Sequence, residues 1–245
     1  MASGIKIENL KKSFNSAKCV ITPIDNFSLD ISANELTTVI GKSGCGKTTL
    51  LKLISGIEKA DEGKVIFYDK DGQEIKEPRI SYVFQEARLL PWKTVGQNLE
   101  LPIRHEEETI RKKLVKEALE LVCLGDIQDL YPSELSGGMA QRVGLARGVI
   151  SKPDILLLDE PFSALDFMTR TKLQSDFSRL QKELSMTMLM ITHDINEAVF
   201  LSHRVIYLNH GKAEKDLKID VETPRQIGDS RLLNYQNYLL HSVFK

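Results

Sequence analysis

The chain has 245 residues, with 33 Lys and Arg against 34 Asp and Glu, which gives a formal net charge of −1. This length suits one large domain, or a domain with a subdomain, that buries a substantial core. The near-neutral charge argues against a surface built to bind DNA or RNA, which carry a dense negative charge.

Cysteine spacing and the amino-terminal sequence bear on the compartment. Cys19, Cys45 and Cys123 are odd in number and far apart, and they include no CxxC pair. This pattern is typical of a reducing compartment and predicts neither a disulfide framework nor a zinc site. The first nine residues lack an apolar signal core, and no apolar run approaches 18 residues. We therefore expect a cytoplasmic protein that does not itself cross a membrane.

Two alternating segments come first in the chain. Residues 6–10 and 27–31 alternate between apolar and polar side chains, which predicts strands of an antiparallel layer. Phe14 lies between these segments. It could be a core aromatic, or it could stack on a nucleotide base, and the sequence does not separate the two interpretations.

A glycine-rich segment, GKSGCGKTT, follows the β-rich run of residues 35–40 and opens the helical run that ends before Gly56. A strand, a glycine loop and a helix in this order are the context that the P-loop pattern requires. Glycines let backbone N–H groups surround a polyphosphate because no Cβ intrudes, and the start of the helix adds its positive dipole end. The predicted phosphate-binding residues are Gly41, Lys42, Ser43, Gly44, Cys45, Gly46, Lys47, Thr48 and Thr49.

Residues 64–68 and 80–84 have the composition of further strands, and the second of them ends at Gln85. Phosphate chemistry tends to collect where the strands of an open α/β sheet end. Taken alone, Gln85 could also be an ordinary surface residue.

From Glu86 the sequence becomes helical. In residues 106–123 we expect a core-facing stripe of apolar side chains: Ile110, Leu114, Ala118, Leu121 and Val122. No strand signal returns before Ile155. We therefore predict a helical subdomain, at about residues 87–150, inserted into an α/β body formed by residues 1–86 and 151–245.

Residues 131–142, YPSELSGGMAQR, predict a turn that leads into a helix ending near Ile150. Ser136 is the expected N-cap, and the free N–H groups beside it form a second potential anion site, although an ordinary capped helix has the same features. Gly144 and Gly148 interrupt this helix, and nothing in the sequence explains them.

The apolar run of residues 155–158 predicts a buried parallel strand that ends in Asp159 and Glu160. Two carboxylates in this position are costly unless they meet a cation or do chemistry. Because side chains alternate along a strand, Asp159 can face a P-loop Mg²⁺ while Glu160 reaches a water molecule.

A helix at 166–184 and a buried strand at 187–191 follow, and this strand ends near His193. His193 is the third polar group at a strand end, after Gln85 and Glu160, which favours a functional role. A strand at 205–208 and an amphipathic helix from about Asp229 complete the predicted body.

Together these motifs resemble the ATPase subunit of an ATP-binding cassette (ABC) transporter over nearly the whole chain. In order, they match the family's adenine-stacking aromatic (Phe14), Walker A motif (Gly41–Thr48), Q-loop (Gln85), signature motif (Leu135–Met139), Walker B motif (Leu157–Glu160), D-loop (Ser163, Ala164, Leu165 and Asp166) and switch histidine (His193). The resemblance implies an α/β fold of the P-loop NTPase class, with a RecA-like core, an antiparallel β subdomain and an inserted helical subdomain. Met139 departs from the Gln that is common in the family and looks like the variant of one importer group.

The resemblance also implies a homodimer that sandwiches two ATP molecules head to tail. Each ATP would lie between the P-loop of one protomer and, in trans, the signature residues Ser136, Gly137, Gly138 and Met139 of the other. Glu160 would polarise the attacking water, while Lys47 and His193 would stabilise the γ-phosphate. The ligands of Mg²⁺ would be Thr48, Gln85 and, through water, Asp159.

Residues 83–95 are similar to the Q-loop region of importers for nitrate, sulfonate, taurine and related small organic solutes. In that family the segment that is here Arg88–Trp92 meets a coupling helix of the membrane permease; the alternative is that Trp92 is simply packed inside. The resemblance thus implies the ATPase subunit of a bacterial importer, peripheral on the cytoplasmic face of the membrane, with permease subunits and a separate solute-binding protein.

Two other classes compete with a transporter subunit. ABC proteins of translation or DNA maintenance usually carry two cassettes in one chain or a long coiled-coil insert, and this sequence has neither. A P-loop kinase or GTPase would not need the segment from Ser136 to Met139. The transported solute is not encoded here, because in this architecture specificity lies in other chains.

Overall fold

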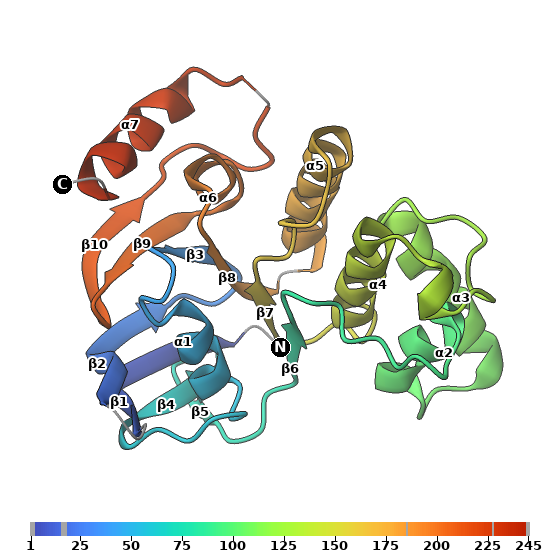
Figure 1. Ribbon diagram of the computed structural model, residues 1–245, viewed down its shortest axis with the longest axis horizontal. Helices are drawn as coiled ribbons and strands as arrows, with labels where there is room; N and C mark the ends of the chain where they lie inside the picture. The colour runs from blue at the N-terminus through green and yellow to red at the C-terminus, as the bar shows by residue number, and fades with distance from the viewer. Residues whose placement is uncertain (1–2, 16–18, 185, 227, 244–245) are drawn as a thin grey trace.

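The computed structural model describes residues 3–15, 19–184, 186–226 and 228–243, which form two sheets with helices around them (Figure 1). The first sheet is antiparallel, with strand order β2-β1-β4-β5, and consists of β1 (Gly4–Asn15), β2 (Val20–Ile31), β4 (Glu62–Tyr68) and β5 (Glu74–Ile75). The predicted antiparallel layer is therefore confirmed. Its strands are longer than expected, so that Phe14 lies within β1 and pairs with Ile21 of β2.

The second sheet has strand order β10-β9-β3-β8-β7-β6. It consists of β3 (Leu36–Ile40), β6 (Ile80–Val83), β7 (Ile155–Asp159), β8 (Thr187–Thr192), β9 (Arg204–Asn209) and β10 (Lys212–Lys218). All of its neighbouring pairs are parallel except β9 with β10. Every residue of β3, β7 and β8 is buried, which explains their continuous apolar runs. Because β3, β8, β7 and β6 are parallel neighbours, their carboxyl ends meet at one edge of the sheet.

Helices cover both faces of the parallel sheet. The helices α1 (Lys47–Ile54) and α6 (Ile195–Leu201) each contact β8, and α6 also contacts α7 (Arg231–Val243). The long helix α5 (Phe167–Leu184) joins β7 to β8. Within the described part of the chain, no helix is both long enough and apolar enough to span a membrane.

Between β6 and β7 the chain forms helices and loops, which lie together at the right of Figure 1. They are α2 (Val95–Glu100), the 3-10 turn η1 (Leu101–Ile103), α3 (Glu108–Leu121), the 3-10 turn η2 (Pro132–Glu134) and α4 (Gly137–Val149). The sequence predicts helices and no strand between residues 87 and 150, and the structure agrees. The subdomain limits at about residues 87 and 150 stay a prediction.

The apolar face of α3 agrees with the expected one except at Ile110. Its buried side chains are Val115, Ala118 and Leu119, and Val122 just after the helix is also buried. Ile110, expected in the core, is 41% exposed. Of the predicted stripe, Ala118 and Val122 are buried, and Leu114 and Leu121 are partly buried against the same core, so the prediction is wrong only at Ile110.

Close packing explains the two glycines of α4. A Cβ at Gly148 would lie 2.4 Å from Cγ2 of Val83 in β6, and one at Gly144 would lie 3.3 Å from Cα of Ala87. The glycines thus let α4 lie directly against the end of β6 and the segment that follows it. Glycine destabilises a helix interior relative to alanine, but here it allows the close contact between α4 and β6.

Substitution of Gly148 by Ala should therefore destabilise the protein. The added methyl overlaps a stiff β-branched side chain, so overpacking should exceed the gain in helix propensity and give a net loss of about 1–2 kcal/mol. Urea unfolding measures this change. Gly125→Ala is the matched control, since a Cβ there has no neighbour within 4 Å and should change stability by less than about 0.5 kcal/mol. A Gly148→Ala variant more stable than the wild type would contradict the packing argument.

Candidate active site

The glycine loop joins β3 to α1 as predicted, and its backbone requires glycine. Gly44 and Gly46 have positive φ values of 78° and 108°, and a Cβ at Gly46 would lie 2.2 Å from the carbonyl oxygen of Pro23. Helix α1 begins immediately afterwards at Lys47, so its free N–H groups point into the loop. The buried Lys47 amine donates to the carbonyl oxygens of Gly41 (2.8 Å) and Lys42 (3.1 Å).

Asp159 is the last residue of β7 and is only 4% exposed. Its two oxygens accept hydrogen bonds from the hydroxyls of Thr48 (3.3 Å) and Tyr82 (3.1 Å). Burial raises the pKa of Asp159, while these two donors oppose that shift. The predicted neighbourhood of Thr48 and Asp159 is present in the structure.

Glu160 follows β7 in a left-handed backbone conformation with φ 46°, which is uncommon for a residue with a side chain. This turn directs its carboxylate towards two other strand ends. Oε2 of Glu160 lies 3.1 Å from Nδ1 of His193 and 3.4 Å from Nε2 of Gln85. The three polar strand ends singled out in the sequence therefore meet.

A cavity of about 510 Å³ separates the glycine loop from this polar group. It is lined by Pro23, Ser43, Gly44, Gly46, Lys47, Thr48, Thr49, Gln85, Glu160 and His193. One wall offers N–H donors and a lysine, and the other offers a carboxylate, an amide and an imidazole. Such a cavity can hold a polyphosphate while the second wall faces its terminal group.

Other predicted binding residues lie outside this cavity. Phe14 is 41% exposed, so its interpretation as a core aromatic is wrong, and Nζ of Lys12 lies over its ring at 5.3 Å from the centroid. The signature residues Ser136, Gly137, Gly138 and Met139 begin α4, where the Ser136 hydroxyl accepts from the Met139 N–H as the expected N-cap. Neither group lines the cavity.

The D-loop, residues 163–166, adjoins both the carboxylate and the signature helix. The Ser163 hydroxyl donates to the carbonyl oxygen of Glu160 (3.0 Å), and Asp166 accepts from the Thr169 N–H at the start of α5. A Cβ at Gly138 would lie 3.5 Å from the Ala164 carbonyl oxygen. The D-loop and the signature residues of one chain therefore form a continuous surface.

Two polar residues of this region have roles that the sequence analysis did not predict. Tyr82 holds Asp159 from the neighbouring strand, and the buried Gln141 of α4 donates to the carbonyl oxygens of Phe84 (3.3 Å) and Pro161 (3.4 Å). Gln141 thereby ties the signature helix to residues next to Gln85 and Glu160. Both roles depend on which strands and helices are neighbours, and no local sequence signal carries that information.

The sheet, the glycine loop and the paired carboxylates together define a P-loop nucleotide-binding protein. A family model described as ABC transporter matches residues 24–163. An uncharacterized ABC transporter ATP-binding protein of Methanocaldococcus jannaschii is 40% identical over 243 residues, 97% of this chain and 90% of that protein. The aliphatic sulfonates import ATP-binding protein SsuB of Bacillus licheniformis is 42% identical over 219 residues, 88% of this chain and 84% of that protein.

A solved structure agrees with these relatives. The dimeric post-hydrolysis state of the ATP-binding cassette MJ0796, bound to ADP and Pi, matches with a TM-score of 0.80 and 31% identity over 89% of this chain and all of that one. The chain therefore belongs to the ABC transporter family, as an ATP-binding cassette of the ABC ATPase fold.

Proposed function

We propose that this chain binds ATP with Mg²⁺ and hydrolyses it to drive a bacterial importer of a small solute, of the nitrate, sulfonate or taurine type. The observation that carries the proposal is the single cavity in which the P-loop faces Glu160, Gln85 and His193. The name of the sulfonate-import relative supports the solute class.

The triphosphate occupies the glycine loop, where backbone N–H groups and the start of α1 surround it. Lys47 turns its amine from the loop carbonyls to the phosphates, and Thr49 adds a further contact. Phe14, which is partly exposed, stacks on adenine. The loop keeps its shape only with glycine at position 46, where φ is positive and a Cβ would clash with the Pro23 carbonyl oxygen.

The donors beside the P-loop fit Mg²⁺. The Thr48 hydroxyl and the Asp159 carboxylate are oxygen ligands already in contact, Gln85 can offer its amide oxygen, and oxygen donors are what this ion prefers. Mg²⁺ neutralises phosphate charge when it is bound. Tyr82 holds Asp159 in place, and Asp159 would hold the ion through water.

Glu160 is the residue that orients and polarises the attacking water, and His193 stabilises the γ-phosphate together with Lys47. The contact between His193 and Glu160 keeps both side chains on the wall that faces the phosphates. Because this wall is built from strand ends, Glu160 and His193 are already in contact before nucleotide arrives.

The signature residues require a second copy of the chain. Ser136 to Met139 form an anion site at the start of α4 but do not line the cavity, so they complete the site of a partner. The relative of known structure is dimeric. We therefore propose that ATP joins two copies of this chain head to tail.

The segment from Arg88 to Trp92 is the proposed contact with the permease. Asn98 holds this segment by bonding both the N–H and the carbonyl of Leu90, and Arg147 donates to the carbonyl oxygens of Ala87 and Arg88. Trp92 is 70% exposed, so the interpretation that it is packed inside is wrong. A preshaped backbone carrying an exposed indole suits binding to an apolar helix.

The test is co-purification with the membrane proteins encoded beside this chain, from detergent-solubilised membranes. Trp92→Ala should lower the yield of complex about tenfold or more while leaving the ATPase activity of the isolated chain intact. Tyr238→Ala, an exposed aromatic on α7, is the matched control and should have no effect. Association with ribosomes or DNA in place of a membrane protein would favour the non-transport alternative and contradict the proposal.

A further inference from the structure

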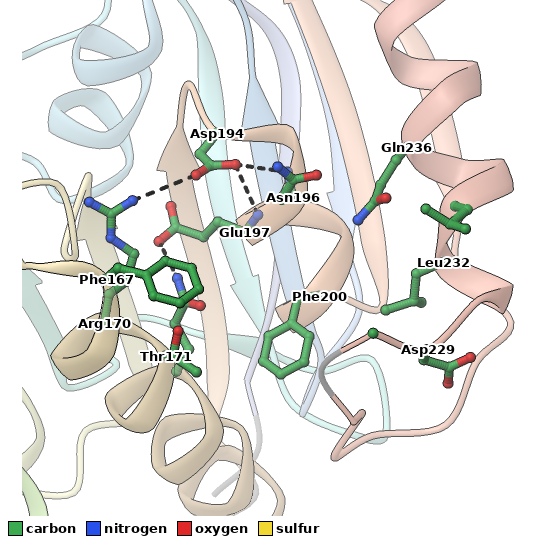
Figure 2. A pocket seen from close by; sticks show the side chains of 13 residues that line it. Phe167, Arg170, Thr171, Asp194, Asn196, Glu197, Phe200, Asp229, Leu232 and Gln236 are labelled. Atoms are coloured by element: carbon green, nitrogen blue, oxygen red, sulfur yellow. Dashed lines mark hydrogen bonds and ion pairs between the residues drawn. The ribbon is translucent and has the colours of Figure 1, made fainter.

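Two side chains on one face of α5 reach the first turn of α6. Arg170 and Gln174 are four residues apart, so they project from the same side of the helix. Nη1 of Arg170 lies 3.8 Å from Oδ2 of Asp194 (Figure 2). Nε2 of Gln174 donates to Oε1 of Glu197 at 3.0 Å. These four residues line a cavity of about 440 Å³ bounded by residues of α5, α6 and α7. The start of α5 is thus held against the start of α6 at two points.

The guanidinium of Arg170 also contacts the D-loop. Its Nη2 donates to the carbonyl oxygen of Leu165 at 2.9 Å, and Leu165 is itself buried. One planar guanidinium thus donates a hydrogen bond to the Leu165 carbonyl and forms a longer ion pair with the Asp194 carboxylate, and its plane fixes the angle between the two nitrogens that make these contacts. A lysine ammonium, as a single point charge on a flexible stem, cannot fix both.

Asp194 directly follows His193 and immediately precedes α6. Its Oδ1 accepts from the N–H groups of Asn196 (2.8 Å) and Glu197 (3.2 Å), so it is the N-cap of that helix. The carboxylate that meets Arg170 is therefore the same one that fixes the backbone beside His193. The imidazole of His193 in turn lies 3.1 Å from Glu160.

We propose that Arg170 is a positioning residue that links the D-loop to His193. The inference rests on the function proposed above, because it concerns the same catalytic centre. A second copy that docks on the D-loop shifts the Leu165 carbonyl, Arg170 carries the shift to Asp194, and His193 moves into its working position. The catalytic centre thereby responds to the presence of its partner through Arg170, which itself touches neither nucleotide nor water.

Steady-state ATP hydrolysis by the purified full chain tests this link. Arg170→Gln and Arg170→Lys should each lower kcat about 10- to 100-fold, since a displacement near 1 Å can cost that much, with KM for ATP within about twofold of wild type. Arg179→Gln is the matched control on the same helix; Arg179 pairs with Asp176 and is largely exposed, and kcat should not change. Wild-type kcat in both Arg170 variants would overturn the proposal, as would full activity of the lysine variant alone.

Asp194→Asn provides a second, independent variant. Asparagine keeps the helix cap but loses the charge that faces Arg170, so folding is preserved and kcat should fall as in Arg170→Gln. The double variant should be no slower than either single variant, because both remove one link. Defects that multiply would show that the two residues act separately and would overturn the link. If Arg170→Gln does not fold, Asp194→Asn and Arg170→Lys decide the question.

Glu160→Gln, measured in parallel, separates this proposal from the proposed function. If Glu160→Gln is inactive while the Arg170 variants are fully active, the proposed role of Arg170 is refuted and the proposed function stands. If Glu160→Gln is fully active, the proposed catalytic role of Glu160 is refuted, and the proposed role of Arg170 is refuted with it.

Discussion

Glu160→Gln is expected to lower kcat for ATP hydrolysis by about 10²- to 10⁴-fold, or roughly 3–5 kcal/mol in barrier height. Glutamine has the same shape and can keep the contacts with His193 and Gln85, but it cannot polarise the attacking water as a carboxylate does. ATP affinity should be preserved, because the P-loop is unchanged. Loss of a negative charge facing the triphosphate should also favour the closed dimer.

Two measurements check this result. Steady-state hydrolysis gives kcat, and size-exclusion chromatography with ATP and Mg²⁺ shows whether the variant elutes as a stable dimer. Glu120→Gln, an exposed position on α3, is the control and should behave as wild type. If the Glu160→Gln variant hydrolyses ATP at close to the wild-type rate, Glu160 does not polarise the attacking water as proposed. A variant that stays strictly monomeric with ATP would count against the shared site.

The parallel sheet and the loop at its edge could be predicted because their signals are local. The apolar runs of β3, β7 and β8 identify buried parallel strands, and each is followed within two residues by polar or glycine-rich sequence. Parallel strands of one sheet end on the same side, so Glu160 and His193 were expected near the P-loop before any strand order was known. Their actual contact confirms that reasoning.

The residues that sequence reasoning missed all depend on long-range neighbours. Tyr82 meets Asp159 because β6 pairs with β7, and Gln141 reaches Phe84 because α4 lies on the end of β6. Neither pairing leaves a periodic trace in the sequence. The polar strand β10 was missed for a related reason, since an edge strand needs no apolar face to be stabilised by its partner β9.

Arg225→Met is expected to destabilise the protein by at least about 3 kcal/mol. Arg225 is 5% exposed, and its Nη1 donates to the carbonyl oxygens of Val199, Phe200 and Ser202 at the end of α6. Helix ends leave such carbonyls without partners, and each one left buried and unbonded costs about 1–3 kcal/mol. Burial lowers the pKa of Arg225 to about 10, so the guanidinium is still charged at neutral pH and donates as a cation.

Urea unfolding followed by circular dichroism measures this loss as a lower midpoint. Arg231→Met is the matched control, since Arg231 pairs with Asp229 on the surface and should contribute less than about 1 kcal/mol. Methionine fills much of the space of the arginine stem, so a large effect would come from the lost donors and the lost charge. The two ends of α6 then make separable contributions: Arg225 fixes where the helix ends, while Asp194 fixes where it begins beside His193. An unchanged unfolding midpoint in Arg225→Met would mean that water satisfies these carbonyls, and that the end of α6 does not depend on Arg225.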